Sequence, residues 1–203
     1  MSVRRNPAAV AVAAAILFLL LACWELSGDS LPFDLSIRNA VHTWASPMAT
    51  GLLLGAAWMG SGWVMLPLGA LVAWRLTLAH PVREAILFGA ACLSANALSE
   101  LLKLAFHRHR PRIFFGLPPA FSYSFPSGHA FVGTVFYGLL AAVLVGSFPA
   151  YRRLIGAMTI VLVLAIGLSR VYLGYHYPSD VLGGWMCAAA WLSMARWYWL
   201  AKR

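Results

Sequence analysis

Residues 7–24 read PAAVAVAAAILFLLLACW, an uninterrupted apolar run that follows Arg4 and Arg5. An α-helix needs about 20 predominantly apolar residues to cross the hydrocarbon core of a bilayer. The length of this run and the positive charges before it therefore predict a first membrane-spanning helix. A fold that begins in this way has lipid as its main solvent.

An alternative for the same run is a leader that is removed from the mature protein. Residues 20–23, LLAC, are similar to a bacterial lipoprotein cleavage box, in which the cysteine would be acylated. Trp24 follows that cysteine, and no linker of small residues comes next. These features favour the retained helix, and whether residues 1–23 are kept stays open.

The composition of the whole chain extends the membrane prediction. Of 203 residues, 62% are hydrophobic and only 10% are charged, whereas about a quarter of an average soluble domain is charged. So few polar side chains cannot cover a water-soluble globule of this size. Six spans would use roughly 120 residues, so residues 1–203 are expected to form a single domain.

Five further apolar runs bring the predicted number of spans to six. They cover approximately Ala49–Trp74, Glu84–Phe106, Gly128–Ser147, Leu154–Leu168 and Val181–Tyr198. The expected fold is thus all-α, a polytopic bundle of six transmembrane helices. Gly60, Ser61 and Gly62 interrupt the second run, where we expect a kink or close packing.

Residues 25–48 are mixed in polarity and predict an amphipathic helix at the membrane interface. The predicted apolar face consists of Ile37, Ala40, Val41 and Trp44, which recur at helical spacing. The three cysteines lie inside apolar runs without a CxxC spacing, so they indicate packing rather than a disulfide framework or a zinc site.

The basic residues are distributed unevenly between the two sides that six spans would create. Nine lie on the amino-terminal side: Arg4, Arg5, Arg75, Arg83, Arg152, Arg153, Arg196, Lys202 and Arg203. The positive-inside rule then places both termini in the cytoplasm and the opposite side of the bundle in the periplasm or cell exterior. The net charge of +9 would suggest nucleic acid in a soluble protein, but these positions favour an anionic lipid as the partner.

Three segments on the outward side carry most of the reactive side chains. Residues 103–111 read KLAFHRHRP, residues 126–129 read PSGH, and residues 169–180 read SRVYLGYHYPSD. In the first, Lys103 and Arg110 are seven residues apart, which puts both cations on one side if the helix continues that far. In the second, a helix start would expose backbone N–H groups that bind anions.

These segments resemble the motifs of the type 2 phosphatidic acid phosphatase (PAP2) superfamily, which also contains vanadium haloperoxidases and glucose-6-phosphatase. The patterns KxxxxxxRP, PSGH and SRxxxxxHxxxD are matched without a departure. The matching positions are Lys103, Arg110, Pro111, Pro126, Ser127, Gly128, His129, Ser169, Arg170, His176 and Asp180. The resemblance implies a membrane lipid phosphatase whose site faces away from the cytoplasm.

The roles that the resemblance implies agree with the chemistry of the residues. The phosphate-binding groups would be Lys103, Arg110, Ser127, Gly128 and Arg170, which neutralise the negative oxygens. His176 would attack phosphorus, with Asp180 holding its tautomer, and His129 would act first as general acid and then as general base. A phosphohistidine intermediate follows from these assignments.

No cofactor or metal is expected. Only Asp180 among the six acidic residues belongs to the motifs, too few to hold a catalytic magnesium ion. The candidate substrates are undecaprenyl diphosphate and phosphatidylglycerol phosphate, ranked highest, followed by phosphatidic acid and a lipid A phosphate. A lipid-to-lipid phosphotransferase with the same site and, from another class, a small transporter are the alternatives; oligomeric state is not predicted.

Residues around the motifs receive plainer interpretations. His107, Arg108, His109 and Arg112 are expected to face solvent or headgroups, and Arg38, His42 and His80 to make hydrogen bonds within the bundle. Glu100 could orient Lys103 or form an ordinary ion pair. Residues 114–125, FFGLPPAFSYSF, predict either packing against the bundle or a hydrophobic flap beside the entry of a lipid tail.

Overall fold

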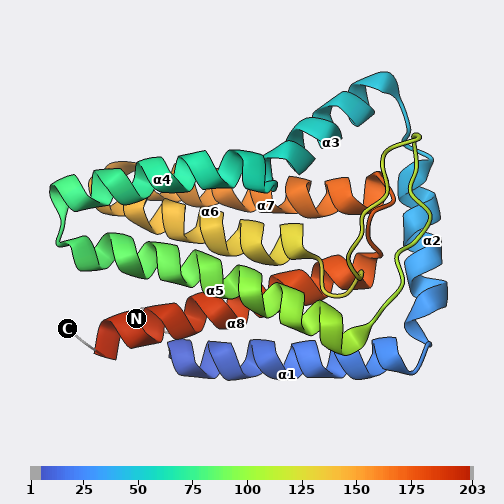
Figure 1. The fold of residues 1–203 in the computed structure, drawn as a ribbon, viewed down its shortest axis with the longest axis horizontal. Helices are drawn as coiled ribbons and strands as arrows, with labels where there is room; N and C mark the ends of the chain where they lie inside the picture. Colours follow the sequence, from blue (N-terminus) through green and yellow to red (C-terminus); the bar gives the residue numbers. More distant parts are fainter. Residues whose placement is uncertain (1–5, 202–203) are drawn as a thin grey trace.

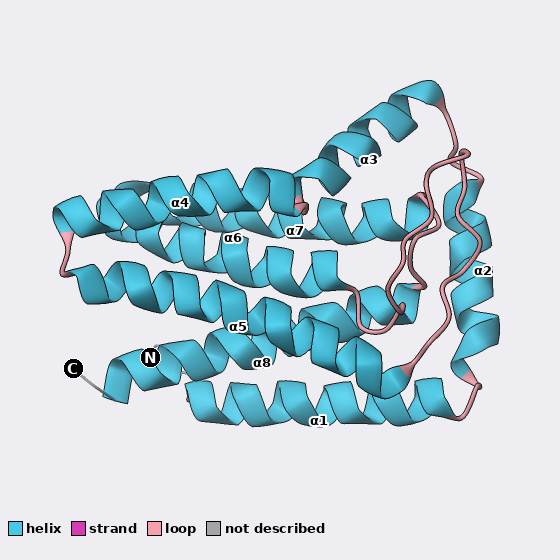
Figure 2. Cartoon of the chain, in the orientation of Figure 1, coloured by secondary structure: helices cyan, strands magenta, loops and turns pink. Residues whose placement is uncertain are grey.

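A computed structural model describes residues 6–201, which form an all-helical bundle without a strand in that range (Figure 1, Figure 2). The helices are α1 (Pro7–Leu26), α2 (Ser30–His42), α3 (Pro47–Met59), α4 (Gly62–Ala79), α5 (Val82–Phe106), α6 (Gly128–Ser147), α7 (Arg152–Tyr172) and α8 (Pro178–Ala201), with a short 3-10 helix at Pro149–Tyr151. The predicted all-α membrane fold is confirmed. Arg4, Arg5, Lys202 and Arg203, which supported the predicted topology, lie outside the described residues.

Local sequence explains where the first helices begin. Pro7 and Pro47 occupy first-turn positions, where the missing proline N–H costs nothing. Asn6 accepts a hydrogen bond from the Ala8 N–H at 3.0 Å, and Ser46 accepts one from the Ala49 N–H at 3.2 Å. These side chains satisfy backbone donors that the helix leaves free.

Five helices of the described range are long and apolar enough to span a membrane. They are α1, α4, α5, α6 and α7 with its preceding turn. The last predicted span corresponds to α8, which has 24 residues and packs along α1 and α6 but is not among those five. Many large apolar side chains on the outside of the bundle are exposed, as lipid contact requires; Trp63, for example, is 82% exposed.

The predicted span Ala49–Trp74 consists of two helices, α3 and α4, because the chain breaks at Gly60 and Ser61, where an interruption was expected. A Cβ atom at Gly60 would lie 2.7 Å from Ile166 Cγ2 and 3.0 Å from His129 Cδ2, closer than packing permits. This is the close packing that the glycines predicted. Helix α3 slants away from the bundle, while α4 runs along it (Figure 1).

Helix α2 lies across one end of the bundle (Figure 2). A helix is present here as predicted, and of its predicted apolar face Val41 alone is buried. Ile37 and Trp44 are 37% and 59% exposed. The residues of α2 that are buried are Ser30, Asp34, Arg38 and Val41. Three of these four side chains are polar, so α2 presents a hydrogen-bonding stripe to the bundle end instead of an apolar one.

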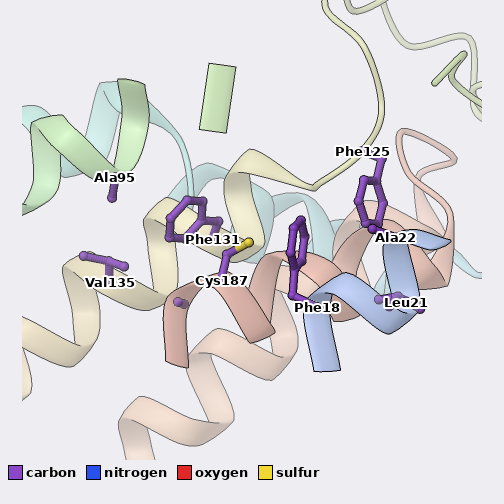
Figure 3. Packing of buried hydrophobic residues seen from close by; sticks show 9 residues of the cluster. Phe18, Leu21, Ala22, Ala95, Phe125, Phe131, Val135 and Cys187 are labelled. Carbon is purple, nitrogen blue, oxygen red and sulfur yellow. The ribbon is translucent and has the colours of Figure 1, made fainter. Parts of the chain in front are cut away.

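One apolar cluster joins the loop before α6 to the helices. Phe18 of α1 stacks on Phe125 of the loop with ring centroids 5.6 Å apart, and Phe131 and Cys187 lie in the same cluster (Figure 3). Cys187 is buried, Cys92 is half-buried and Cys23 is exposed, and all three are free thiols. Phe125 is fully buried, so the PSGH segment begins directly after a residue that packs in this cluster.

Candidate active site

The three motif segments meet at the end of the bundle that α2 crosses (Figure 1). Lys103 lies in the last turn of α5, Ser127 precedes α6, and residues 173–177 connect α7 to α8. The Ser127 N–H donates to the Asp180 carbonyl oxygen at 2.9 Å, which ties the second segment to the third. The structure thus brings the eight predicted site residues into one region.

His176 and Asp180 form the centre of this region. Both side chains are buried, and His176 Nδ1 lies 3.3 Å from Asp180 Oδ2. The same carboxylate oxygen accepts the Tyr177 N–H at 2.8 Å and the Ser124 hydroxyl. With Nδ1 directed at the carboxylate, the lone pair of Nε2 is on the opposite side of the ring, where it could act as a nucleophile.

Burial sets the proton affinity of His176. Removal from water lowers the pKa of the imidazole to about 4, because the charged form loses its hydration. Arg110 and Arg170 lower it further, while Asp180 raises it. The neutral ring is therefore the form present at neutral pH, and a neutral ring is the form that can attack an electrophile.

The turn that carries His176 depends on a glycine. Gly174 has φ +80°, and a Cβ atom there would lie 2.8 Å from the Arg112 carbonyl oxygen. The Tyr175 and His176 N–H groups both donate to the Arg170 carbonyl oxygen, at 2.9 and 3.1 Å. The tight turn that results directs His176 back toward the end of α7.

Arg110 reaches the site from a loop, not from a helix. Lys103 and Arg110 would share one helical face only if the helix continued that far, and it does not, because α5 ends at Phe106 and His107 adopts a left-handed backbone with φ 50°. Arg110 Nη1 lies 3.0 Å from His176 Nε2 and donates to the Tyr175 carbonyl oxygen at 2.8 Å. Its other donors reach the Ser122 carbonyl at 2.6 Å, the Ser122 hydroxyl at 3.0 Å and the Tyr123 carbonyl at 3.2 Å.

The start of α6 forms a corner with α5 in which several hydrogen-bond donors gather. A Cβ atom at Gly128 would lie 3.3 Å from both Lys103 Nζ and Ser99 Oγ, so glycine leaves room between these donors and the helix. The Ser127 side chain does not cap its own helix, and the hydroxyls of Ser99 and Ser127 are buried without a hydrogen-bond partner. Unused donors at a helix N-terminus are the arrangement that binds phosphate.

Two further predicted residues border this corner. Arg170 is buried with its guanidinium 4.2 Å from the centre of the Tyr175 ring, and its Nε has no partner. His129 lies in the first turn of α6, within electrostatic range of Arg170, His176 and Lys103. Lys103 pairs with Glu100, its Nζ 2.6 Å from Oε1, although the Glu100 side chain is half exposed.

The prediction for Arg108 is wrong. Its side chain is only 8% exposed and makes ion pairs with Glu25, Asp34 and Asp180, whereas we expected it to face solvent or headgroups. His107, His109 and Arg112 are exposed, in agreement with the same prediction. The signal that could have indicated a buried network is the spacing of Ser30, Asp34 and Arg38 at every fourth residue of α2.

Arg38 and His42 contact the loop between α5 and α6. Arg38 donates to the Arg112 carbonyl oxygen and lies 4.0 Å from the centre of the Phe114 ring, and the His42 ring stacks on Phe114 at 3.7 Å. At the other end of the predicted flap, Phe121 is fully exposed. The loop therefore combines packing against α2 with an exposed apolar tip beside the groups that bind Arg110.

A cavity of about 880 Å³ lies elsewhere, between α4, α5, α6 and α8. Phe88, Leu139 and Trp191 are among the side chains that line it, and none of the eight predicted site residues does. The three motif segments lie at the other end of the helices (Figure 1).

The fold and this site define a class: a helical membrane protein with a buried histidine–aspartate pair and the cations Lys103, Arg110 and Arg170 at the same end of the bundle. The profile of the PAP2 superfamily matches residues 84–203, and the chain belongs to that superfamily.

Similar proteins cover most of the chain. Phosphatidylglycerophosphatase B of Bacillus subtilis is 28% identical over 172 residues, which are 83% of this chain and 84% of that protein. An undecaprenyl-diphosphatase of Sulfolobus acidocaldarius is 28% identical over 186 residues, 88% of this chain and 85% of that protein. The crystal structure of a transmembrane PAP2-type phosphatidylglycerolphosphate phosphatase from Bacillus subtilis superposes with a TM-score of 0.88 at 25% identity, covering 96% of this chain and 98% of that one.

Proposed function

We propose that this chain is a metal-independent phosphatase that removes the terminal phosphate of a membrane lipid through a phosphohistidine intermediate. The observation that carries the proposal is the position of His176, whose Nδ1 faces Asp180 while its Nε2 faces the cation Arg110 at 3.0 Å. Family membership and the names of the relatives support the same class of reaction.

The cations prepare the phosphate for attack. A phosphate ester repels nucleophiles because its oxygens are negative, and preorganised donors reduce that repulsion as the transition state forms. Lys103, Arg170 and the N–H groups at the start of α6 would bind these oxygens. Arg110 now donates to protein oxygens and to Nε2, so substrate binding exchanges its contact with Nε2 for contacts with phosphate.

Two displacements complete the reaction. In the first, Nε2 of His176 forms a bond to phosphorus while the bond from phosphorus to the lipid oxygen breaks, and His129 gives that oxygen a proton. In the second, His129 takes a proton from water, whose oxygen attacks phosphorus and releases the imidazole. Asp180 keeps a proton on Nδ1 throughout, which stabilises the charge that develops on the ring.

A lipid with a terminal phosphate fits both the site and the membrane. Undecaprenyl diphosphate and phosphatidylglycerol phosphate rank first among the candidates, because 28% identical relatives carry the names of enzymes for each. Phosphatidic acid and a lipid A phosphate share the same chemistry and come next. Transfer to a second lipid in place of water would use the same intermediate.

In our proposal the chain forms one domain in the inner membrane. The site faces the periplasm or the cell exterior, and both termini lie in the cytoplasm. The support is the position of the basic residues of the described helices. Arg75, Arg83, Arg152, Arg153 and Arg196 belong to the helix ends opposite the site (Figure 1). Such residues favour the cytoplasmic side.

Phosphate release from the four candidate lipids by the purified full chain in detergent tests the proposal. We expect release from at least one lipid, unchanged by a chelator and inhibited by vanadate, which resembles the transferring phosphoryl group. A parallel assay with a lipid acceptor separates hydrolysis from transfer. The proposal is wrong if His176→Ala releases phosphate as fast as the wild type, or if activity requires a divalent metal with every substrate.

A further inference from the structure

The buried guanidinium of Arg108 holds together three carboxylates from three helices. Its Nε lies 2.9 Å from Glu25 Oε1 of α1, its Nη2 lies 2.7 Å from Asp34 Oδ2 of α2, and its Nη1 lies 2.6 Å from Asp180 Oδ1 of α8. The side chains of Glu25, Asp34 and Asp180 are at most 9% exposed. A single cation therefore links the carboxylate of the reaction centre to the two helices that precede the motifs.

The two oxygens of Asp180 have separate partners. Oδ2 faces His176 and accepts from Tyr177 and Ser124, whereas Oδ1 faces Arg108. The contact with Arg108 fixes the rotation of the carboxylate, because a group bound at both oxygens cannot turn without losing one set of bonds. The orientation of Asp180 in turn fixes the tautomer and the plane of the His176 ring.

Asp34 holds Arg108 and the first turn of α8 at the same time. Its Oδ1 accepts the Ser179 N–H at 2.8 Å, and its Oδ2 accepts the Ser179 hydroxyl at 2.7 Å. That N–H is one of the donors that a helix leaves free in its first turn. Asp34, which belongs to α2, therefore caps the start of α8. Arg108 Nη1 also donates to the Ser179 hydroxyl at 2.7 Å.

We propose that Arg108 and Asp34 are positioning residues for the reaction, which orient Asp180 and through it the attacking nitrogen of His176. The inference rests on the proposed function and adds residues that lie outside the three motifs. Burial of one cation and three carboxylates is an inefficient source of stability, because desolvation offsets much of the attraction. Fixing the geometry of a reacting pair is a better reason for such a network.

The charges around the pair determine what loss of Arg108 does to its protonation. His176 faces Arg110, Arg170 and His129. Asp180 faces Arg108, with Glu25, Asp34 and Tyr177 nearby. Neutralising Arg108 leaves more negative charge near Asp180, which stabilises a proton on the pair. The neutral, attacking form of His176 is then lost at a higher pH than in the wild type.

The variant Arg108→Gln tests this inference, with Arg112→Gln as the matched control. Arg112 lies on the same loop, is exposed, and contacts Arg38 only through its backbone carbonyl. For Arg108→Gln we expect kcat to fall about 10- to 100-fold, the loss typical of groups that orient metal-bound histidines through a hydrogen bond, with KM changed little. We expect the acid limb of the pH profile, the pH at which activity is lost on acidification, to move about one unit higher. Arg112→Gln should match the wild type in kcat, in KM and in the position of the acid limb.

Two further variants keep the test valid if Arg108→Gln fails to fold. Arg108→Lys retains the charge but cannot reach three carboxylates at once, so kcat should fall while the acid limb stays near its wild-type position. Asp34→Asn keeps the shape of the side chain but removes its negative charge. We therefore expect kcat to fall and the acid limb to stay in place or move to lower pH. The inference would be overturned if Arg108→Gln and the wild type had the same acid limb. It would also be overturned if Arg108→Gln raised KM and left kcat unchanged.

An NMR titration of the histidine rings separates failure of this inference from failure of the proposed function. The measurement needs no turnover, and His176→Gln identifies the signal. We expect His176 to titrate about one pH unit higher in Arg108→Gln than in the wild type. If no lipid is hydrolysed but this shift is present, the proposed reaction is wrong and the coupling is right; if the wild type is active and the shift is absent, only the positioning role is wrong.

Discussion

Replacing Lys103 with methionine removes one cation from the phosphate site and keeps most of the side-chain volume. The Nζ atom belongs to a side chain that is 8% exposed, and it lies 3.3 Å from where a Cβ atom of Gly128 would be. It is therefore held at the N-terminus of α6 before substrate arrives. Loss of one such preorganised donor costs about 100- to 1000-fold in rate, or about 2.7–4 kcal/mol in transition-state stabilisation.

Glu100→Gln is the control for this change. Glu100 holds Nζ at 2.6 Å but is half exposed, and exposed ion pairs are worth about 0–1 kcal/mol. We expect kcat/KM of Glu100→Gln to stay within about fivefold of the wild type, measured as phosphate release from mixed micelles. If Lys103→Met stays within tenfold of the wild type, or if Glu100→Gln is equally damaging, Lys103 does not bind the reacting phosphate.

Three other predictions follow from the site. His129→Ala should retain more activity on substrates with good leaving groups, which need little protonation on departure; equal losses on good and poor leaving groups would contradict the acid role. Because burial lowers the pKa of His176 to about 4, protonation of this ring should not limit the rate at pH 6 and should do so as the pH drops through about 4; a His176 ring that titrates near pH 6.5 by NMR would contradict this prediction. Ser122→Cys, in a background without native cysteines, should react with a membrane-impermeant thiol reagent in intact cells, and labelling only after membrane disruption would reverse the proposed orientation.

The long helices could be predicted because their apolar runs determine them almost alone. The predicted span Gly128–Ser147 has the bounds of α6, and the span Glu84–Phe106 ends where α5 ends. Lipid-facing helices need apolar residues along their whole length, so the pattern is strong and local. The motif spacing likewise placed Asp180 four residues after His176, and the two side chains meet where residues 173–177 lead into α8.

The place of Arg108 in the buried ion network could not be predicted from the sequence around it. Arg108 meets Asp34 and Asp180 across 74 and 72 residues of sequence, and nothing within the loop distinguishes it from exposed Arg112. The inward face of α2 was missed for a related reason. Apolar periodicity favoured Ile37, but the buried end of the bundle offers hydrogen-bond partners, so the polar stripe containing Asp34 turns inward.

Trapping the covalent intermediate tests the central claim most directly. Wild-type enzyme mixed with a lipid labelled in its terminal phosphate and quenched within one turnover should carry an acid-labile label on the peptide that contains His176. The variant His176→Ala should carry no label and release no phosphate, while His129→Ala should hold the label longer, because activation of water is impaired. Label that persists in His176→Ala, or turnover of that variant at the wild-type rate, would show that another group attacks phosphorus.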